Sequence, residues 1–163
     1  MANVFDKITG TEHVVAESSR LKATTAGHIY DLKVTKDTDN GTIVCVGNHV
    51  EGQVFEAKAY VAGEKPFLIL TSPLAYNGKK SWSDEKYFFN AEGEIARAYE
   101  LHVDDIFTVS AEAFVGTPVV GQFVDASYTL SETAGESGFV GEIIEEVYYT
   151  NSTSYRILVR SIG

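Results

Sequence analysis

The sequence predicts an all-β protein, a single-domain β-barrel or sandwich of about nine to ten mainly antiparallel strands. From residue 28 onward, apolar residues recur mostly at every second position, which is the period of a half-buried strand. Glycine, proline and Asn-Gly pairs separate these runs at short intervals, as is typical of all-β domains. No helix of ordinary length is visible, so we expect at most one short helix.

Composition narrows the function classes. The 163 residues suit one domain, and 44% hydrophobic residues allow a sizeable core. The 23 acidic and 13 basic residues give a net charge of −10, which argues against a nucleic-acid groove and against docking on anionic lipid. The N-terminus has no signal-peptide pattern and no run is long enough to span a membrane, so we expect synthesis in a cytoplasm.

Residues 1–27 are expected to form an N-terminal arm or an edge strand, ahead of a β-barrel or sandwich domain at residues 28–163. Most residues of this segment are small or polar, and few side chains are large and apolar. An extended arm gains affinity by adding a strand to a partner's sheet. The alternative is a first strand near residues 12–17 that follows a loose terminus.

Residues 28–47 are predicted to form a β-hairpin. Its first strand shows alternating apolar positions at Tyr30, Leu32 and Val34. The turn ends in Asn40-Gly41, a pair that favours positive φ. Residues 43–46 have the continuous apolar pattern of a central strand buried on both faces. The single cysteine, Cys45, lies in this strand and is expected to be a buried core residue.

The next strands are expected near residues 55–61 and 67–70, followed by a long irregular stretch at 72–93. That stretch contains the only tryptophan, Trp82, among several tyrosines and phenylalanines. Its aromatic side chains either plug the open end of a barrel or present a contact surface, and the usual burial of large aromatics favours the plug.

Residues 94–124 predict two strands, near 95–102 and 105–109, on either side of a polar turn. Ser110 is expected to cap a short helical turn. Gly116-Thr117-Pro118 then forms a corner, and further strands are expected at 121–130, 139–149 and 154–162.

The last two strands are predicted to form a hairpin with its turn centred on Ser152. In this register the expected cross-strand pairs are Tyr149 with Tyr155, Val147 with Ile157, and Tyr148 with Arg156, with Glu146 diagonal to Arg156.

A search for chemistry finds no catalytic signature. The four histidines show no tight metal-ligand spacing, and no nucleophile elbow, phosphate-binding loop or dinucleotide fingerprint is present. His102 with Asp104 and Asp105 suggests a weak cation site or, more often, a turn. Glu145 and Glu146 face opposite sides of a strand and cannot form a glycosidase pair with each other.

The other charged residues favour structural pairing. Glu142, Glu145 and Glu146 are expected on solvated strand faces or as partners of Arg156 or Arg160, and Arg97 is expected to pair with a carboxylate across the sheet. We therefore expect a protein without enzymatic activity, with no catalytic residues, no cofactor and no metal site.

Part of the chain resembles head decoration proteins of tailed bacteriophages, which are accessory or cement proteins of the capsid. The resemblance is carried by Glu92–His102, Asp105–Val109 and Gly116–Val124. It implies a protein that binds the major capsid protein on the outside of the expanded head and stabilises the shell, often as a homotrimer. Such a protein would be located at the capsid surface of the virion.

The family offers no catalytic residues to carry over. The candidate capsid contacts are three apolar residues of the arm and the lone tryptophan, namely Val4, Phe5, Ile8 and Trp82. The alternatives are another virion module, such as a tail or fibre component, a carbohydrate-binding β-sandwich, or a small β-barrel hydrolase based on the glutamate cluster.

Overall fold

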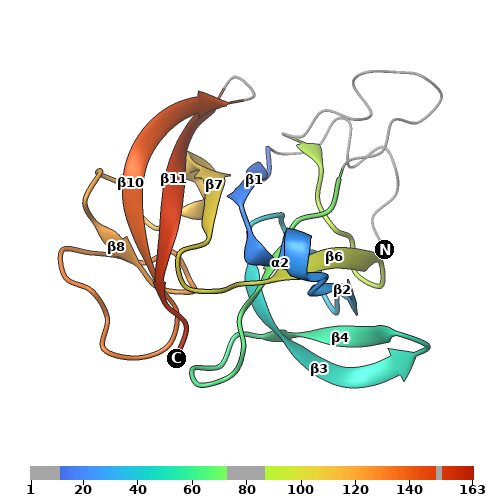
Figure 1. The fold of residues 1–163 in the computed structure, drawn as a ribbon. Helices are drawn as coiled ribbons and strands as arrows, with labels where there is room; N and C mark the ends of the chain where they lie inside the picture. Colours follow the sequence, from blue (N-terminus) through green and yellow to red (C-terminus); the bar gives the residue numbers. More distant parts are fainter. Residues whose placement is uncertain (1–11, 73–86, 150–151) are drawn as a thin grey trace.

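The computed structural model describes residues 12–72, 87–149 and 152–163. These residues form eleven strands in two sheets, with one five-residue α-helix and one 3-10 turn. The all-β prediction is confirmed. Figure 1 shows the two sheets side by side, with the β10–β11 hairpin on one side of the molecule and the barrel strands on the other.

The first sheet is a closed barrel of five strands. Its order around the barrel is β2 (Ile29–Lys33), β4 (Val54–Ala59), β3 (Ile43–Glu51), β5 (Phe67–Ile69) and β6 (Ile95–Glu100). The β2–β4 pairing is parallel, and every other neighbouring pair is antiparallel. Because β6 pairs back onto β2, this sheet has no free edge.

Every second side chain of the barrel strands fills the interior, as the period of two requires. Small residues on β6 leave room for larger ones on the facing strands, since five strands enclose little space. This interior core consists of Leu32, Val34, Val44, Phe67, Ile69, Ala96 and Ala98.

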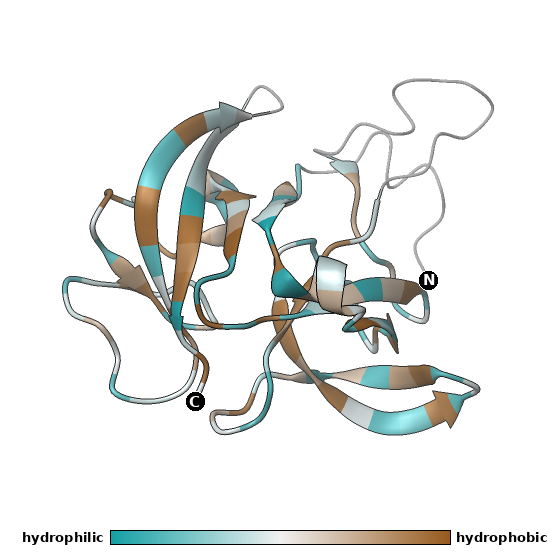
Figure 2. Ribbon diagram, viewed as in Figure 1, coloured by the Kyte–Doolittle hydropathy of each residue, from teal (hydrophilic) through white to brown (hydrophobic). Residues whose placement is uncertain are grey.

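The second sheet has six strands. Its order is β1 (Ala16–Arg20), β7 (Ile106–Ser110), β11 (Ser152–Ser161), β10 (Val140–Tyr149), β8 (Phe123–Val124) and β9 (Leu130–Ser131). β1 is an edge strand paired with β7, and it leads into α2 (Lys22–Ala26). Figure 2 shows hydrophobic and hydrophilic bands along β10 and β11, as expected for strands with one buried face.

β3 and β5 form a wall shared by two hydrophobic cores. Val44 and Phe67 point into the barrel, whereas their neighbours Ile43 and Leu68 belong to a second core on the outside of the barrel. That second core also contains side chains of the six-stranded sheet, such as Phe107. The prediction that residues 43–46 form a central strand buried on both faces holds for its first three residues.

Two tyrosines join the sheets by hydrogen bonds. Tyr128 precedes β9, and Gly41 precedes β3. The Tyr128 hydroxyl donates a hydrogen bond to the carbonyl oxygen of Gly41. The Tyr60 hydroxyl, after β4, accepts a hydrogen bond of 2.7 Å from the backbone N–H of Phe139, before β10. Burial raises the pKa of the Tyr128 hydroxyl, which keeps it protonated and able to donate.

The predicted hairpin at residues 28–47 is wrong in its pairing. β2 pairs with β4 and β6, and β3 pairs with β4 and β5. Thr42 bonds locally to the carbonyl of Asp39, but other polar residues between the strands bond to distant segments. Thr38 and Asn90 exchange two backbone hydrogen bonds of 2.8 and 2.9 Å, and the Asn40 side chain bonds both backbone groups of Thr71.

The C-terminal hairpin exists, but its predicted register is wrong by three residues. Tyr149 lies opposite Ser152 and Glu145 lies opposite Arg156, with a bulge between Ile143 and Glu145. The pairing extends to Tyr149 and Ser152, beyond the end of the predicted ladder. The observed register buries Tyr155, Ile157 and Val159 in the second core together.

Three local predictions also change. The run at 121–130 divides into the short strands β8 and β9, which pair with each other. The helical turn after Ser110 is present as η3 (Ala111–Ala113), but the Ser110 side chain does not cap it. Its hydroxyl instead accepts a hydrogen bond of 3.0 Å from the backbone N–H of Val15. The helix α2 has no counterpart among the predicted elements.

We predict that Tyr128→Phe lowers the free energy of unfolding by about 1–3 kcal/mol at pH 7, because the buried Gly41 carbonyl loses its partner. The Tyr128 pKa is raised above its ordinary 10.0, so the folded state retains the proton more strongly than the unfolded state. This stabilisation is complete below pH 10 and is lost at higher pH, by at most about 1.4 kcal/mol per pH unit. Urea unfolding between pH 9 and 11 should therefore show the wild-type advantage shrinking, and a constant difference would contradict this.

We also predict that Gly141→Ala destabilises the protein by about 1–3 kcal/mol through overpacking. A Cβ at this position would lie 2.6 Å from Cγ2 of Ile157 and 3.1 Å from Cγ2 of Val124. The matched control is Gly135→Ala, where the nearest atom to the new Cβ is 3.6 Å away. Urea unfolding of the two variants should separate them clearly, and equal midpoints would show that the sheet adjusts without cost.

Candidate functional site

The four predicted capsid contacts, Val4, Phe5, Ile8 and Trp82, lie outside the described residues. The same holds for most of the aromatic stretch around Trp82. At its described end, Phe88 and Phe89 are buried, and Phe89 stacks on His13 with ring centroids 4.6 Å apart. The capsid-contact assignments therefore stay predictions.

Residues 102–105 carry the chain from the barrel to the six-stranded sheet. The backbone N–H of Asp105 donates to the carbonyl of His102 at 3.1 Å, and the N–H of His102 donates to the Asp105 carboxylate at 2.8 Å. Asp104 has a φ of 76°, in the left-handed region that aspartate tolerates at turns. The interpretation of Asp104 and Asp105 as turn residues is confirmed.

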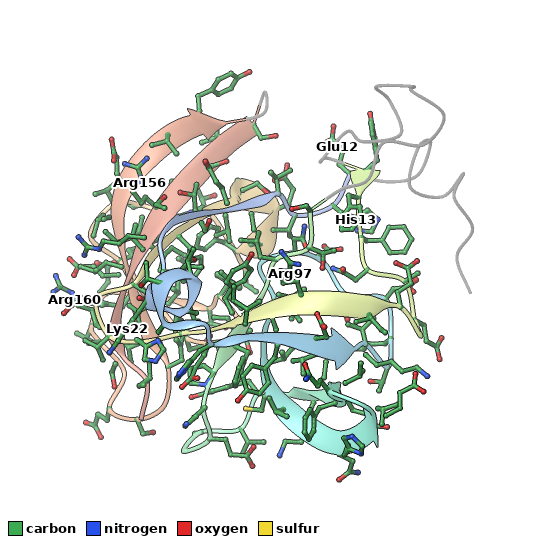
Figure 3. All side chains as sticks on the ribbon, turned by 45° about the vertical axis from the view of Figure 1, so that its right-hand side comes forward. Glu12, His13, Lys22, Arg97, Arg156 and Arg160 are labelled. Atoms are coloured by element: carbon green, nitrogen blue, oxygen red, sulfur yellow. The ribbon has the colours of Figure 1, made fainter. Side chains whose placement is uncertain are left out.

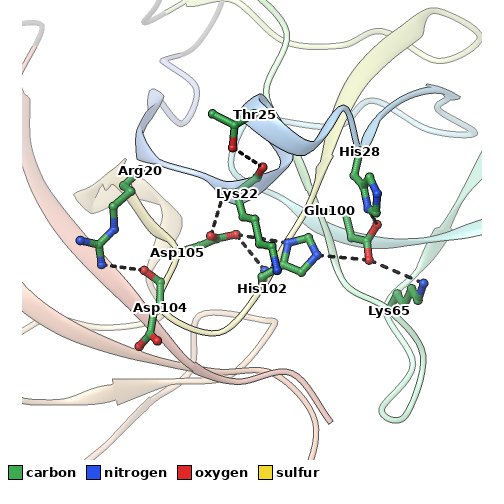
Figure 4. Close-up of polar contacts among 9 residues, drawn as sticks. All are labelled: Arg20, Lys22, Thr25, His28, Lys65, Glu100, His102, Asp104 and Asp105. Carbon is green, nitrogen blue, oxygen red and sulfur yellow. Dashed lines mark hydrogen bonds and ion pairs between the residues drawn. The ribbon is translucent and has the colours of Figure 1, made fainter.

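The buried Asp105 carboxylate also organises the start of α2. One oxygen accepts the hydrogen bond from His102, and the other accepts a 3.0 Å hydrogen bond from the backbone N–H of Lys22. Figure 4 shows this carboxylate between α2 and the turn. Both oxygens thus serve backbone donors, which explains why the residue is buried despite its charge.

A cluster of His28, Glu100 and His102 lies beside this turn. Nδ1 of His28 is 2.7 Å from one carboxylate oxygen of Glu100, and Nε2 of His102 is 3.6 Å from the other. Nζ of Lys65 also approaches Glu100, at 3.6 Å. Figure 4 shows these basic side chains converging on Glu100 from separate segments of the chain.

Strand pairing creates the cluster. β2 and β6 are antiparallel, and the N–H of Glu100 donates to the carbonyl of His28 at 3.1 Å, which brings the two residues together at one end of the barrel. His102 follows Glu100 by two residues, the spacing that returns to the same side of an extended chain. The only signal in the sequence was this last spacing, since His28 is distant along the chain.

The environment of the cluster is mixed. The Glu100 side chain is buried, whereas the His28 side chain is 50% exposed. Nδ1 of His102 is buried and makes no hydrogen bond within the described part of the chain, although the Asp105 carboxylate lies 3.9 Å away. The ligand atoms of His28, Glu100 and His102 all lie within 4.8 Å of one another, a spacing that allows them to hold a metal ion.

Residues 115–120 form an exposed apolar corner, here called the valine corner. Val115, Val119 and Val120 are 67%, 58% and 49% exposed. Hydrogen bonds fix the corner at both ends, from Val115 N–H to the Tyr128 carbonyl and from Gly121 N–H to the Ile143 carbonyl. The Gln122 side chain also accepts a 2.9 Å bond from the N–H of Val119.

A groove of about 660 Å³ lies between the outer face of β3 and β4 and the segments around η3 and Tyr128. Its lining contains four charged side chains but neither histidine nor cysteine. The charged lining residues are Lys36, Asp39, Lys58 and Glu112.

The C-terminal glutamates make ion pairs along the hairpin. Arg156 pairs with Glu145, and Arg160 pairs with Glu142. Both arginines are labelled in Figure 3. The structural interpretation of these two glutamates is confirmed. Arg97 lies opposite Asp31 across the β2–β6 ladder.

We predict that Asp105→Ala destabilises the protein by about 2–4 kcal/mol, because two backbone donors lose a charged acceptor. The neighbouring Asp104→Gly is the matched control. It also removes a carboxylate but relieves the left-handed backbone, so the stability should change little or increase. Urea unfolding checks both, and a loss for Asp104→Gly equal to that for Asp105→Ala would exclude this assignment.

Among the residues that the structure describes, no helix is long and apolar enough to cross a membrane. Comparison of the chain with protein-family models, curated proteins and solved structures gave no match.

Proposed function

We propose that this chain is a non-enzymatic structural protein of a bacteriophage virion. It binds the major capsid protein on the outer surface of the expanded head, as a homotrimer, and stabilises the shell. It acts without a catalytic site.

The observation that carries this proposal is the position of the valine corner. Two of its valines lie within Gly116–Val124, the segment that resembles head decoration proteins, and Val115 directly precedes that segment. In the structure this segment presents three exposed valines on a hydrogen-bonded frame. Exposed apolar side chains held in a fixed arrangement favour binding, because less conformational entropy is lost on contact.

Avidity makes such a small contact sufficient. One corner with three valines offers far less area than a stable protein–protein interface of about 1,600 Å². A trimer that engages a symmetric lattice repeats the contact, and the second and third contacts form at a high effective concentration. The sequence adds four further candidate contacts, Val4, Phe5, Ile8 and Trp82.

The charge of the chain suits a partner surface that is neutral or basic rather than nucleic acid. A net charge of −10 repels the packaged genome, whose phosphates favour basic proteins. A decoration protein contacts the exterior of the shell and has no need of a nucleic-acid groove.

We predict that the purified protein co-sediments with undecorated expanded heads at a fixed ratio to the capsid lattice. The double variant Val119→Ser/Val120→Ser should bind at least tenfold more weakly, because it removes apolar contact area repeated in each subunit. The measurement is the bound fraction against protein concentration. Analytical ultracentrifugation of the free protein and of the bound complex reports whether a trimer forms.

Val61→Ser is the matched control for this test. Val61 is 47% exposed, a fraction similar to the 49% of Val120. It lies elsewhere in the chain, between β4 and β5. Its binding should equal that of the wild type. Absence of co-sedimentation of the wild type at micromolar concentration would overturn the proposed function, and equal binding by the double variant would remove the valine corner from it.

A further inference from the structure

We propose that His28, Glu100 and His102 form a Zn²⁺ site. This inference stands independently of the proposed function. Two imidazoles and one carboxylate are a ligand set that binds zinc, with the fourth position taken by water. The three ligand atoms already lie within 4.8 Å of one another.

The observed distances are close to those of a bound site. Ligands about 2.0–2.2 Å from a tetrahedral zinc ion are about 3.3–3.6 Å from one another. Nε2 of His102 is 3.6 Å from Glu100, so this pair needs almost no movement. Nδ1 of His28 is 2.7 Å from the other oxygen of Glu100, so this half-exposed side chain must shift to share one ion with His102.

The second coordination shell is also present. A histidine that binds zinc through one ring nitrogen commonly directs the other nitrogen to a carboxylate. Nδ1 of His102 is buried, lacks a hydrogen bond within the described residues and faces Asp105 at 3.9 Å. Asp105 is itself fixed by the backbone N–H groups of Lys22 and His102. A bound ion would give this buried nitrogen a defined role as a donor to Asp105.

Lys65 is the group that opposes the ion. Its Nζ is 3.6 Å from Glu100, where its positive charge competes with a cation. The Lys65 side chain is 75% exposed and lies on the loop before β5, so it moves into solvent at little cost. Because Lys65 competes with the ion for Glu100, removing the Lys65 charge should strengthen Zn²⁺ binding.

A bound ion at this location would link separate parts of the fold. His28 and Glu100 lie at the end of the barrel, whereas His102 begins the turn that leads to β7 of the other sheet. Zinc would therefore tie the barrel to the connection between the sheets. Because the ligands are brought together by folding, the ion should bind the folded state preferentially and raise its stability.

The test is isothermal titration of the untagged full chain with ZnCl₂ after removal of metals by a chelator. We expect one ion per chain with a Kd in the micromolar range or tighter, and no binding of Mg²⁺, which prefers oxygen ligands. At a hundredfold excess over Kd, the Tm should rise by about 5–10 °C. X-ray absorption at the zinc edge should show nitrogen and oxygen ligands, including imidazole.

Variants separate this site from adventitious binding. His28→Ala should weaken Zn²⁺ binding by about tenfold or more, whereas His49→Ala, which removes an exposed histidine on β3, should not. Lys65→Ala should tighten binding by about two- to fivefold. The proposal is overturned if no stoichiometric binding occurs, if His28→Ala binds like the wild type, or if His49→Ala loses as much affinity. Circular dichroism confirms that each variant is folded.

Discussion

The wall formed by β3 and β5 is the constraint on which the rest of the structure depends. Adjacent residues on these strands face opposite ways, so Val44 and Phe67 fill the barrel while Ile43 and Leu68 pack outward. Neither core is complete without this wall. Residues of the six-stranded sheet pack against the outward face of β5 and of the first residues of β3, and these residues are buried.

Polar contacts then fix how the two sheets meet. The hydroxyls of Tyr128 and Tyr60 satisfy buried backbone groups across the boundary, where an unpaired group would be costly. Asp105 does the same at the crossing from β6 to β7, where its carboxylate binds two backbone N–H groups. The boundary is therefore held by specific hydrogen bonds as well as by apolar packing, and these bonds select one arrangement of the sheets.

The two surfaces with functional potential occupy different parts of this frame. The valine corner lies in the loop between η3 and β8 and offers apolar contact with no titratable group of its own. The cluster around Glu100 lies at the end of the barrel, beside the connection between the sheets, and offers three possible metal ligands. In our proposals the first serves attachment to a shell and the second strengthens the protein that attaches. A rigid β-protein is well suited to bracing a lattice because its binding groups stay in place.

The sequence by itself determined the all-β class, most strand positions, the burial of Cys45 and the turn at Asp104, since each depends on local period or local backbone preference. Tertiary structure decided which strands are neighbours. Residues 28–47 resemble a hairpin locally, yet Thr38 and Asn40 bond to distant segments, and the C-terminal register follows the core rather than the expected turn. The cluster of His28 with Glu100 was hidden for the same reason. The alternation of apolar and polar residues indicates which face of a strand each side chain occupies. Its neighbour across the sheet depends on how the whole chain packs.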